Sequence, residues 1–238
     1  MNLALFDLDH TLLPLDSDHA WGEFTTRIGW TDASAFKRRN DAFYAQYQAG
    51  TLDIHEYVYF ATEAARLHGR AAAARAHARF MREVIEPAIT PQALALVERH
   101  RRAGDRLIVV TATNEFVTRP IAARFGIDEL IAVELARGPD GWITGKIAGT
   151  PSFRAGKVTR VADWLAAHGQ GWGDAEITFY SDSRHDLPLL QQAQHPVATN
   201  PDDTLRAIAA ERGWPVLDLF NLETVVDRLL PSGKPHEH

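Results

Sequence analysis

The pattern of apolar and polar residues divides the chain into short strands and longer amphipathic helices. Three runs rich in apolar residues have the length of buried strands, at 3–9, 106–111 and 176–181. Strands that alternate with helices predict a parallel sheet covered on both faces. The other elements expected are helices over 91–103, 114–125, 156–168, 187–193 and 204–211, and strands over 196–199 and 214–218.

Two stretches depart from this alternation. From about residue 19 to about residue 86, aromatic and aliphatic residues recur at intervals of three and four, which predicts an all-helical insertion over the carboxyl edge of the sheet. A hairpin is expected over 130–147, with arms at 131–136 and 142–147 and a turn at Pro139-Asp140-Gly141.

The expected fold class is therefore α/β, with a Rossmann-like parallel sheet core and a helical cap inserted after the first strand. The core is expected to comprise residues 1–14 and 89–231, and the cap residues 15–88. The polar residues 232–238 are expected to form a flexible tail.

Composition limits the classes of function open to this chain of 238 residues. A net charge of −6 argues against nonspecific nucleic-acid binding, and no apolar stretch approaches the length of a membrane-spanning helix. Cysteine is absent, which excludes disulfides, thiolate metal sites and thiol nucleophiles. The N-terminus has no basic leader and carries two acids within its first nine residues, which is not typical of a signal peptide. We expect a cytoplasmic protein that binds neither nucleic acid nor membranes.

Polar side chains follow the predicted strands at the edge where parallel sheets bind ligands. Asp7 and Asp9 end the first strand, Thr111 ends the second and Asp182 ends the third. Because neighbouring strands lie roughly 4.8 Å apart, these groups can surround one small anion. Carboxylates at such an edge can bind a divalent cation, attack an electrophile or exchange a proton.

The order and spacing of these residues resemble the four motifs of the haloacid dehalogenase (HAD) superfamily of phosphohydrolases. Asp7-Leu8-Asp9-His10-Thr11 resembles the first motif, Asp-x-Asp-x-Thr or Val. Thr111 and Lys157 stand where the second motif has a strand-end hydroxyl and the third has a lysine near a helix start. The helical insertion resembles the phosphoserine-phosphatase-like branch, subfamily IB.

The fourth motif is commonly Gly-Asp-Gly-x-x-Asp. In this chain Asp182 and Asp186 keep the spacing of the two acids, while Ser181 and Ser183 stand in place of the glycines. The resemblance covers nearly the whole chain and implies a phosphoric monoester hydrolase that depends on Mg²⁺.

The resemblance also implies roles for individual residues. Asp7 would be the nucleophile and form an aspartyl-phosphate, while Asp9 would protonate the leaving alkoxide and later deprotonate the attacking water. Mg²⁺ would be held by the carboxylates of Asp7 and Asp182 and by the backbone carbonyl of Asp9. Asp186 would orient the ligands of that ion.

Phosphate contacts complete this set of implied roles. Thr111 and Lys157 would bind the phosphoryl oxygens, assisted by backbone N–H groups near Leu8 and Ala112. Thr113 and Asn114, which follow Thr111, are interpreted as helix caps.

Two positions in the helical insertion bear on the substrate. Asp16 stands where similar phosphoserine phosphatases have an acid that binds the substrate amine. An ungapped alignment through Gly50-Thr51-Leu52 places Tyr59 where they have an arginine for the carboxylate. Since tyrosine cannot supply a guanidinium fork, the expected substrate is a small phosphorylated metabolite such as histidinol phosphate. A phosphoserine phosphatase and a phosphotransferase stay as alternatives.

Two non-enzymatic classes of protein fit the sequence less well. A signalling receiver domain usually has about 120 residues and an adjacent acidic pair, which fits neither the Asp-x-Asp spacing nor the helical insertion. A non-catalytic phosphate-binding protein on the same fold is disfavoured because every expected polar group is present. The sequence is compatible with a monomer or a homodimer.

Overall fold

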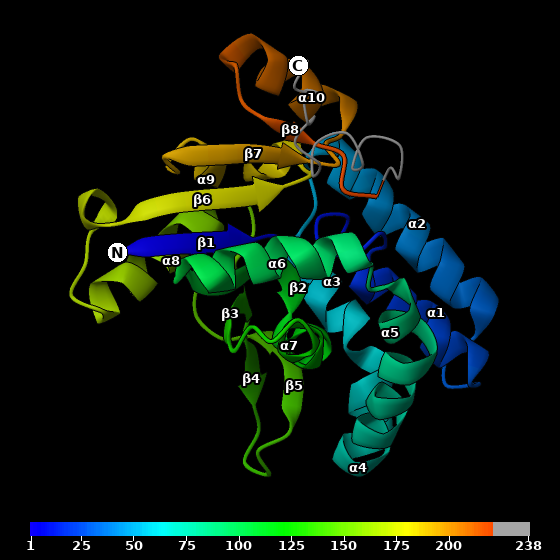
Figure 1. The fold of residues 1–238 in the computed structure, drawn as a ribbon. Coiled ribbons are helices and arrows are strands. Elements are labelled where there is room, and N and C mark those ends of the chain that lie inside the picture. Colours follow the sequence, from blue (N-terminus) through cyan, green and yellow to red (C-terminus); the bar gives the residue numbers. More distant parts are fainter. Residues whose placement is uncertain (221–238) are drawn as a thin grey trace, which may run out of the picture.

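The computed structural model describes residues 1–220 and contains a six-stranded sheet in the order β3-β2-β1-β6-β7-β8 (Figure 1). All five neighbouring pairs of strands are parallel, so the predicted α/β fold class is confirmed. The strands are β1 (Asn2–Phe6), β2 (Arg106–Asn114), β3 (Glu129–Val133), β6 (Glu176–Ser181), β7 (His195–Thr199) and β8 (Val216–Leu217).

Helices cover both faces of the sheet, because alternate residues of each strand point to opposite sides. Ala4 and Phe6 of β1 share a buried cluster with the helices α6 and α7. Leu3 and Leu5 share the other cluster with α8, α9 and α10. The helix bounds are α6 (Pro91–Ala103), α7 (Glu115–Arg124), α8 (Ala155–Ala167), α9 (Leu187–Leu190) and α10 (Asp203–Arg212).

A helical segment between β1 and β2 lies beyond the carboxyl ends of the strands, as expected (Figure 1). Its bounds are α1 (Ser17–Arg27), α2 (Ala33–Ala49), α3 (Ile54–Ala61), α4 (Glu63–Phe80), a π-helical turn (Met81–Ile85) and α5 (Glu86–Ala88). Asp16, Asp32 and Asp53 cap the first three helices by accepting hydrogen bonds from backbone N–H groups. Trp21, Phe24 and Phe80 join the cluster that contains Phe6, so aromatic packing anchors α1 and α4 to the core.

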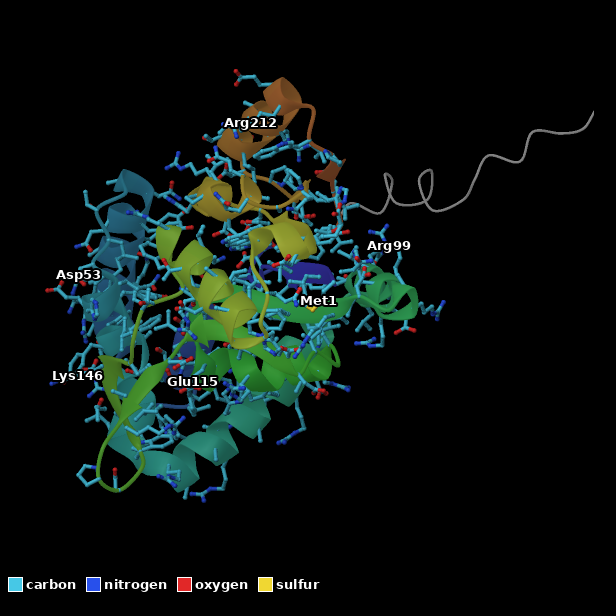
Figure 2. The ribbon with its side chains drawn as sticks, turned by 90° about the vertical axis from the view of Figure 1, so that its left-hand side faces the viewer. Met1, Asp53, Arg99, Glu115, Lys146 and Arg212 are labelled. Atoms are coloured by element: carbon cyan, nitrogen blue, oxygen red, sulfur yellow. The ribbon has the colours of Figure 1, made fainter. Side chains whose placement is uncertain are left out.

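The hairpin differs in part from the prediction. Residues Glu129–Val133 pair in parallel with β2, so the start of the expected first arm belongs to the main sheet. The hairpin itself pairs β4 (Leu135–Arg137) with β5 (Ile143–Ile147). Figure 2 shows Lys146 of β5 on the same side of the molecule as Asp53, which caps α3.

Several bounds differ from the expected ones, and part of the prediction cannot be placed. The first strand ends at Phe6, so Asp7–Asp9 belongs to the loop beyond it, and the second strand continues to Asn114. The expected tail over 232–238, and the end of the expected core over 221–231, lie outside the described residues. Within residues 1–220, no helix has both the length and the apolar character needed to span a membrane.

Candidate active site

The candidate site lies at the carboxyl end of β1, where the strand order of the sheet reverses. The N–H of Asp7 donates to the carbonyl of Tyr180 on β6 (2.9 Å), which continues the strand pairing by one residue. The next carbonyl, that of Leu8, accepts from the N–H groups of Thr11, Leu12 and Leu13 and turns the chain. Ligands of open α/β sheets bind at this kind of switch point.

Lys157, in the first turn of α8, joins two of the candidate carboxylates. Its Nζ lies 2.8 Å from Oδ1 of Asp7 and 2.6 Å from Oδ2 of Asp186, and all three side chains are buried. Burial lowers the pKa of Lys157, but the negative charges of Asp186 and Asp7 outweigh it and leave the pKa above its ordinary value. The lysine is therefore protonated at neutral pH.

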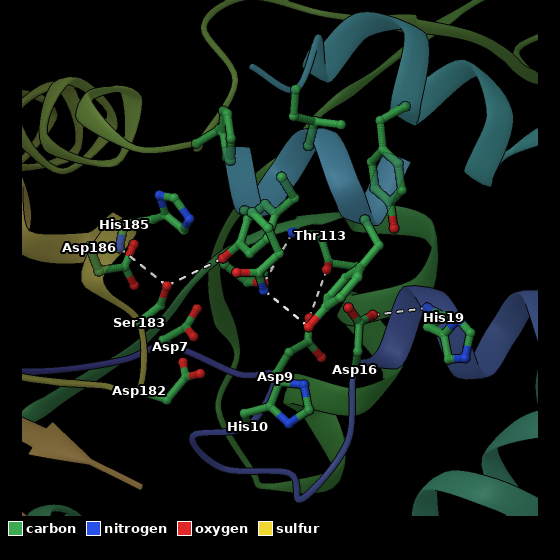
Figure 3. Close-up of a pocket in the computed structure, with 18 of the residues that line it drawn as sticks. Asp7, Asp9, His10, Asp16, His19, Thr113, Asp182, Ser183, His185 and Asp186 are labelled. Atoms are coloured by element: carbon green, nitrogen blue, oxygen red, sulfur yellow. Dashed lines mark hydrogen bonds between the residues drawn. The ribbon is translucent and has the colours of Figure 1, made fainter. Parts of the chain in front are cut away.

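Asp182 faces Asp7 across the end of the sheet (Figure 3). Oγ1 of Thr11 lies 3.2 Å from Oδ1 of Asp182 and 3.4 Å from Oδ2 of Asp7, and it accepts the N–H of Asp182 (3.0 Å). Burial raises the pKa of Asp182, and the charges of Asp7 and Asp186 raise it further. The carboxyl groups of Asp7, Asp182 and Asp186 thus gather around the single ammonium group of Lys157.

Asp9 is held from two sides. Its Oδ1 accepts the N–H of Ser17 (2.9 Å) and its Oδ2 accepts the hydroxyl of Thr113 (2.7 Å). Burial raises the pKa of Asp9 to about 7, with Asp16 and Asp7 adding to the rise and the two hydrogen bonds opposing it. Such a carboxyl group can donate or accept a proton near neutral pH.

Thr113 corrects one prediction. The sequence favoured a helix cap at Thr113 and Asn114, yet only Asn114 caps α7, with its side chain accepting the N–H of Val117. Thr113 lies two residues after Thr111 on β2, so both side chains point to the same face of the strand, and its hydroxyl reaches Asp9. Thr111 is buried, and its Oγ1 accepts the N–H of Thr113 (3.1 Å).

A cavity of about 690 Å³ opens above these residues, between the sheet and the helical segment (Figure 3). Asp7, Asp9 and Asp16 line the cavity. Oδ1 of Asp16 also accepts the N–H of His19 (2.9 Å). The other predicted site residues that line it are Thr111, Ala112, Lys157, Asp182 and Asp186.

The structure does not bring Tyr59 to this cavity. Its side chain is 48% exposed, stacks under the guanidinium of Arg66 and lines a separate surface hollow beside Lys146. Tyr57 lines the cavity instead. Positions two apart on a helix lie on nearly opposite sides, so the ungapped alignment selected the outer face of α3.

Tyr47 and Ser183 also line the cavity, although neither was among the candidate site residues. The Tyr47 hydroxyl lies 3.2 Å from Oγ of Ser183, and 136 positions separate the two residues along the chain. A sequence motif contains no signal for a contact between residues so far apart. The sequence did show that Ser183 stands where the fourth motif commonly has glycine.

Removal of Lys157 should destabilise the fold, because it leaves buried carboxylates without their cation. We expect Lys157→Ala to lower the free energy of unfolding by about 3 kcal/mol, the scale for breaking a buried ion pair. Urea denaturation of the parent and the variant measures this difference. Lys146→Ala, which removes an exposed lysine, is the control. A Lys157→Ala variant as stable as the parent would show that this ion pair does not stabilise the fold.

Sequence comparisons give independent information on the chain. A family model described as haloacid dehalogenase-like hydrolase matches residues 4–191. A histidinol-phosphatase of Neisseria meningitidis serogroup C (strain 8013) is 44% identical over 220 residues, which cover 91% of this chain and 98% of that protein. The phosphoserine phosphatase SerB1 of Mycobacterium tuberculosis is 35% identical over 57% of this chain and 43% of its own length.

Structural comparisons agree with these matches. A protein of unknown function from Bordetella pertussis Tohama I superimposes with a TM-score of 0.87 at 49% identity, covering 92% of this chain and 99% of its own. A substrate-bound phosphoserine phosphatase shares the fold, with a TM-score of 0.63 at 15% identity over 95% of this chain and 97% of its own. With a family model over most of its length and a near full-length phosphatase relative, the chain belongs to the haloacid dehalogenase-like hydrolases and is a phosphoric monoester hydrolase.

Proposed function

We propose that this phosphatase works through an aspartyl-phosphate on Asp7, depends on Mg²⁺ and acts on a small phosphorylated amine such as histidinol phosphate. The observation that carries the proposal is the convergence of Asp7, Asp9, Lys157 and Asp182 on the floor of one cavity. Each group has a distinct task there, and the tasks together make up a two-step phosphoryl transfer.

The donor set at this edge fits a magnesium ion. Among residues 1–220, no three His, Cys, Asp or Glu side chains form a preformed metal cage. Mg²⁺ does not require one, since it keeps several waters and takes one or two carboxylates. Asp7, Asp182 and the carbonyl of Asp9 would hold it, and Asp186 would orient that set. When bound, the ion would neutralise charge on the phosphoryl group.

Asp7 is the proposed nucleophile because it follows the central strand and faces the cavity. The ammonium of Lys157, 2.8 Å from Oδ1 of Asp7, can bind both the carboxylate and an incoming phosphoryl oxygen. Thr111 and backbone N–H groups near Leu8 and Ala112 would bind the remaining oxygens. These contacts position the ester for in-line attack, which supplies much of the catalysis in phosphoryl transfer.

Asp9 is the proposed acid and base. With its pKa raised to about 7, a large fraction of Asp9 carries a proton at neutral pH and can give it to the leaving alkoxide. The carboxylate that remains can then accept a proton from the water that hydrolyses the aspartyl-phosphate. The hydroxyl of Thr113 and the N–H of Ser17 hold Asp9 in place for both steps.

The acidic end of the cavity supports a cationic substrate. Burial raises the pKa of Asp9 and of Asp18, and the negative charge of Asp16 raises both further. A substrate ammonium beside Asp16 would relieve this repulsion, whereas the carboxylate of phosphoserine would add to it. The Neisseria relative named histidinol-phosphatase supports the same choice, and SerB1 keeps phosphoserine as the alternative.

The helical segment is proposed to act as a cap. We divide the described residues into a core of residues 1–14 and 89–220 and a cap of residues 15–88, because the cavity is formed between these two parts. A cap that encloses the ester excludes bulk water during transfer to Asp7 and must admit water for the second step.

Phosphate release from histidinol phosphate and from phosphoserine tests the proposal. We expect activity with Mg²⁺, loss of activity with a chelator and recovery when Mg²⁺ is added back. We also expect kcat/KM to be higher for histidinol phosphate. A strong preference for phosphoserine would reject the substrate assignment, and full activity in the presence of the chelator would reject the metal. Transfer of the phosphoryl group to an added alcohol would favour a phosphotransferase.

Substitution of Asp16 should separate recognition of the amine from the chemistry. We expect Asp16→Asn to raise KM for histidinol phosphate roughly tenfold, since a charge-assisted contact is weakened. KM for p-nitrophenyl phosphate, which has no amine, should stay within about twofold. Asparagine also caps helices well, so α1 should keep its N-terminus. Equal changes for both esters would show that Asp16 does not recognise the amine.

A further inference from the structure

The carboxyl end of α2 lies against the loop that carries Asp182. The hydroxyl of Tyr47 is 3.2 Å from Oγ of Ser183, and its ring centroid is 4.4 Å from that of His185. Within the described structure no residue of α2 is fully buried, although Phe36 and Phe43 pack against Phe60 of α3. The contact between Tyr47 and Ser183 adds a polar link between the carboxyl end of α2 and the core.

Two arginines of the core hold the same end of α2. Nη2 of Arg184 donates to the carbonyl of Gln48 (3.0 Å), and Nη1 of Arg154 donates to the carbonyl of Gly50 (2.9 Å). The last carbonyls of a helix lack partners within it and carry the negative end of its dipole, so cations are favourable there. These contacts keep Tyr47 in reach of Ser183.

A short chain of hydrogen bonds connects Ser183 to Asp186 in the site. Its Oγ accepts the N–H of His185 (3.2 Å), and its own N–H donates to Oγ of Ser181 (3.2 Å). The hydroxyl of Ser181 donates to Oδ2 of Asp186 (2.8 Å), which also binds Lys157. Glycines, which are common at positions 181 and 183 of this motif, would provide neither hydroxyl.

The hydroxyl of Tyr47 is suited to act as a neutral donor in this place. Burial raises its pKa, and the charges of Asp182, Asp186 and Asp7 raise it further, while the hydrogen bond with Ser183 opposes the rise. The three carboxylates thus lie close enough to Tyr47 to affect its ionisation, although it belongs to the helical segment and not to the sheet.

We propose that Tyr47 is a positioning residue for phosphoryl transfer: with α2 over the cavity, its hydroxyl holds Ser183 and thereby the loop from Asp182 to Asp186. Closure of the cap then also positions Asp182 and Asp186, because Tyr47 holds their loop only when α2 lies over the cavity. The kinetic tests of this inference rest on the proposed function, whereas the hydrogen-exchange test does not.

Removal of the hydroxyl with retention of the ring tests the inference. Tyr47→Phe should lower kcat for p-nitrophenyl phosphate roughly tenfold, the scale of one lost hydrogen bond, and leave KM within about twofold. Tyr44→Phe is the matched control, because Tyr44 lies one turn earlier on α2 and lines the same cavity, while its hydroxyl accepts a hydrogen bond from Gln48 of the same helix (3.0 Å). An unchanged kcat in Tyr47→Phe would overturn the inference.

A double-mutant cycle shows whether Tyr47 acts through Ser183. We expect Tyr47→Phe combined with Ser183→Ala to be no slower than Ser183→Ala alone. Losses that multiply would show that Tyr47 acts elsewhere and would overturn the inference. Thermal melting of each variant checks that it is folded.

Hydrogen exchange gives a readout that needs no activity. Amides of residues 182–186 should exchange faster in Tyr47→Phe than in the parent or in Tyr44→Phe, since the loop has lost a contact. Unchanged exchange would overturn the inference. If the parent hydrolysed no phosphomonoester, the proposed function would fail, and the exchange rates would still decide this question.

Discussion

Replacement of Asp7 by asparagine is expected to abolish phosphomonoester hydrolysis, with kcat lowered by at least about 10⁴-fold. An amide cannot attack phosphorus, and Asp7 is the carboxylate that follows the central strand and contacts Lys157. Because Lys157 keeps its 2.6 Å contact with Asp186, the variant should still fold. Phosphate release under saturating substrate measures the effect.

The control for this prediction is the same substitution away from the site. Asp163→Asn changes an exposed carboxylate on α8 and should leave kcat unchanged. If Asp7→Asn turned over at a rate near that of the parent, Asp7 could not be the nucleophile, and another residue of the cavity would have to take its place.

Replacement of Asp9 by asparagine should slow the second half of the reaction far more than the first when the leaving group is good. A p-nitrophenolate departs without a proton, so Asp7 can still be phosphorylated, whereas the attack of water lacks its base. We expect the steady-state rate to fall about 10²- to 10⁴-fold, the range for loss of a general base. Rapid mixing should show a burst of p-nitrophenolate close to one equivalent per enzyme.

The poor leaving group of an alkyl phosphate provides the comparison. With histidinol phosphate, Asp9→Asn should show no burst, because the alkoxide needs the proton that Asp9 carries at its raised pKa of about 7. A burst of the same size with both esters would contradict the role of Asp9 as acid, and a parent-like steady state would contradict its role as base.

Features with local causes were predictable from the sequence. The apolar runs predicted the strands, and Asp7, Thr111 and Asp182 come together because parallel strands end at one edge. Lys157 was recognised by its motif, and the structure places its Nζ against Asp7 although 150 positions separate the two residues. The spacing of aromatic residues was also sufficient to predict the helical segment.

Features that depend on strand ends, helix faces or distant contacts were not predictable. The second strand was expected to stop at Thr111, but it continues to Asn114, and this extension brings Thr113 to Asp9. Tyr57 and Tyr59 both fit a helix, and only tertiary packing decides which of them faces the cavity.

In the proposed reaction the phosphoryl group passes through a covalent bond to Asp7. The most direct measurement is mass spectrometry of the N-terminal peptide after acid quench of Asp9→Asn during turnover of p-nitrophenyl phosphate. A phosphoryl group is expected on Asp7, where it should build up with the burst, and it should be absent from Asp7→Asn. A full burst without phosphate on Asp7, or with phosphate on another residue, would contradict this reaction.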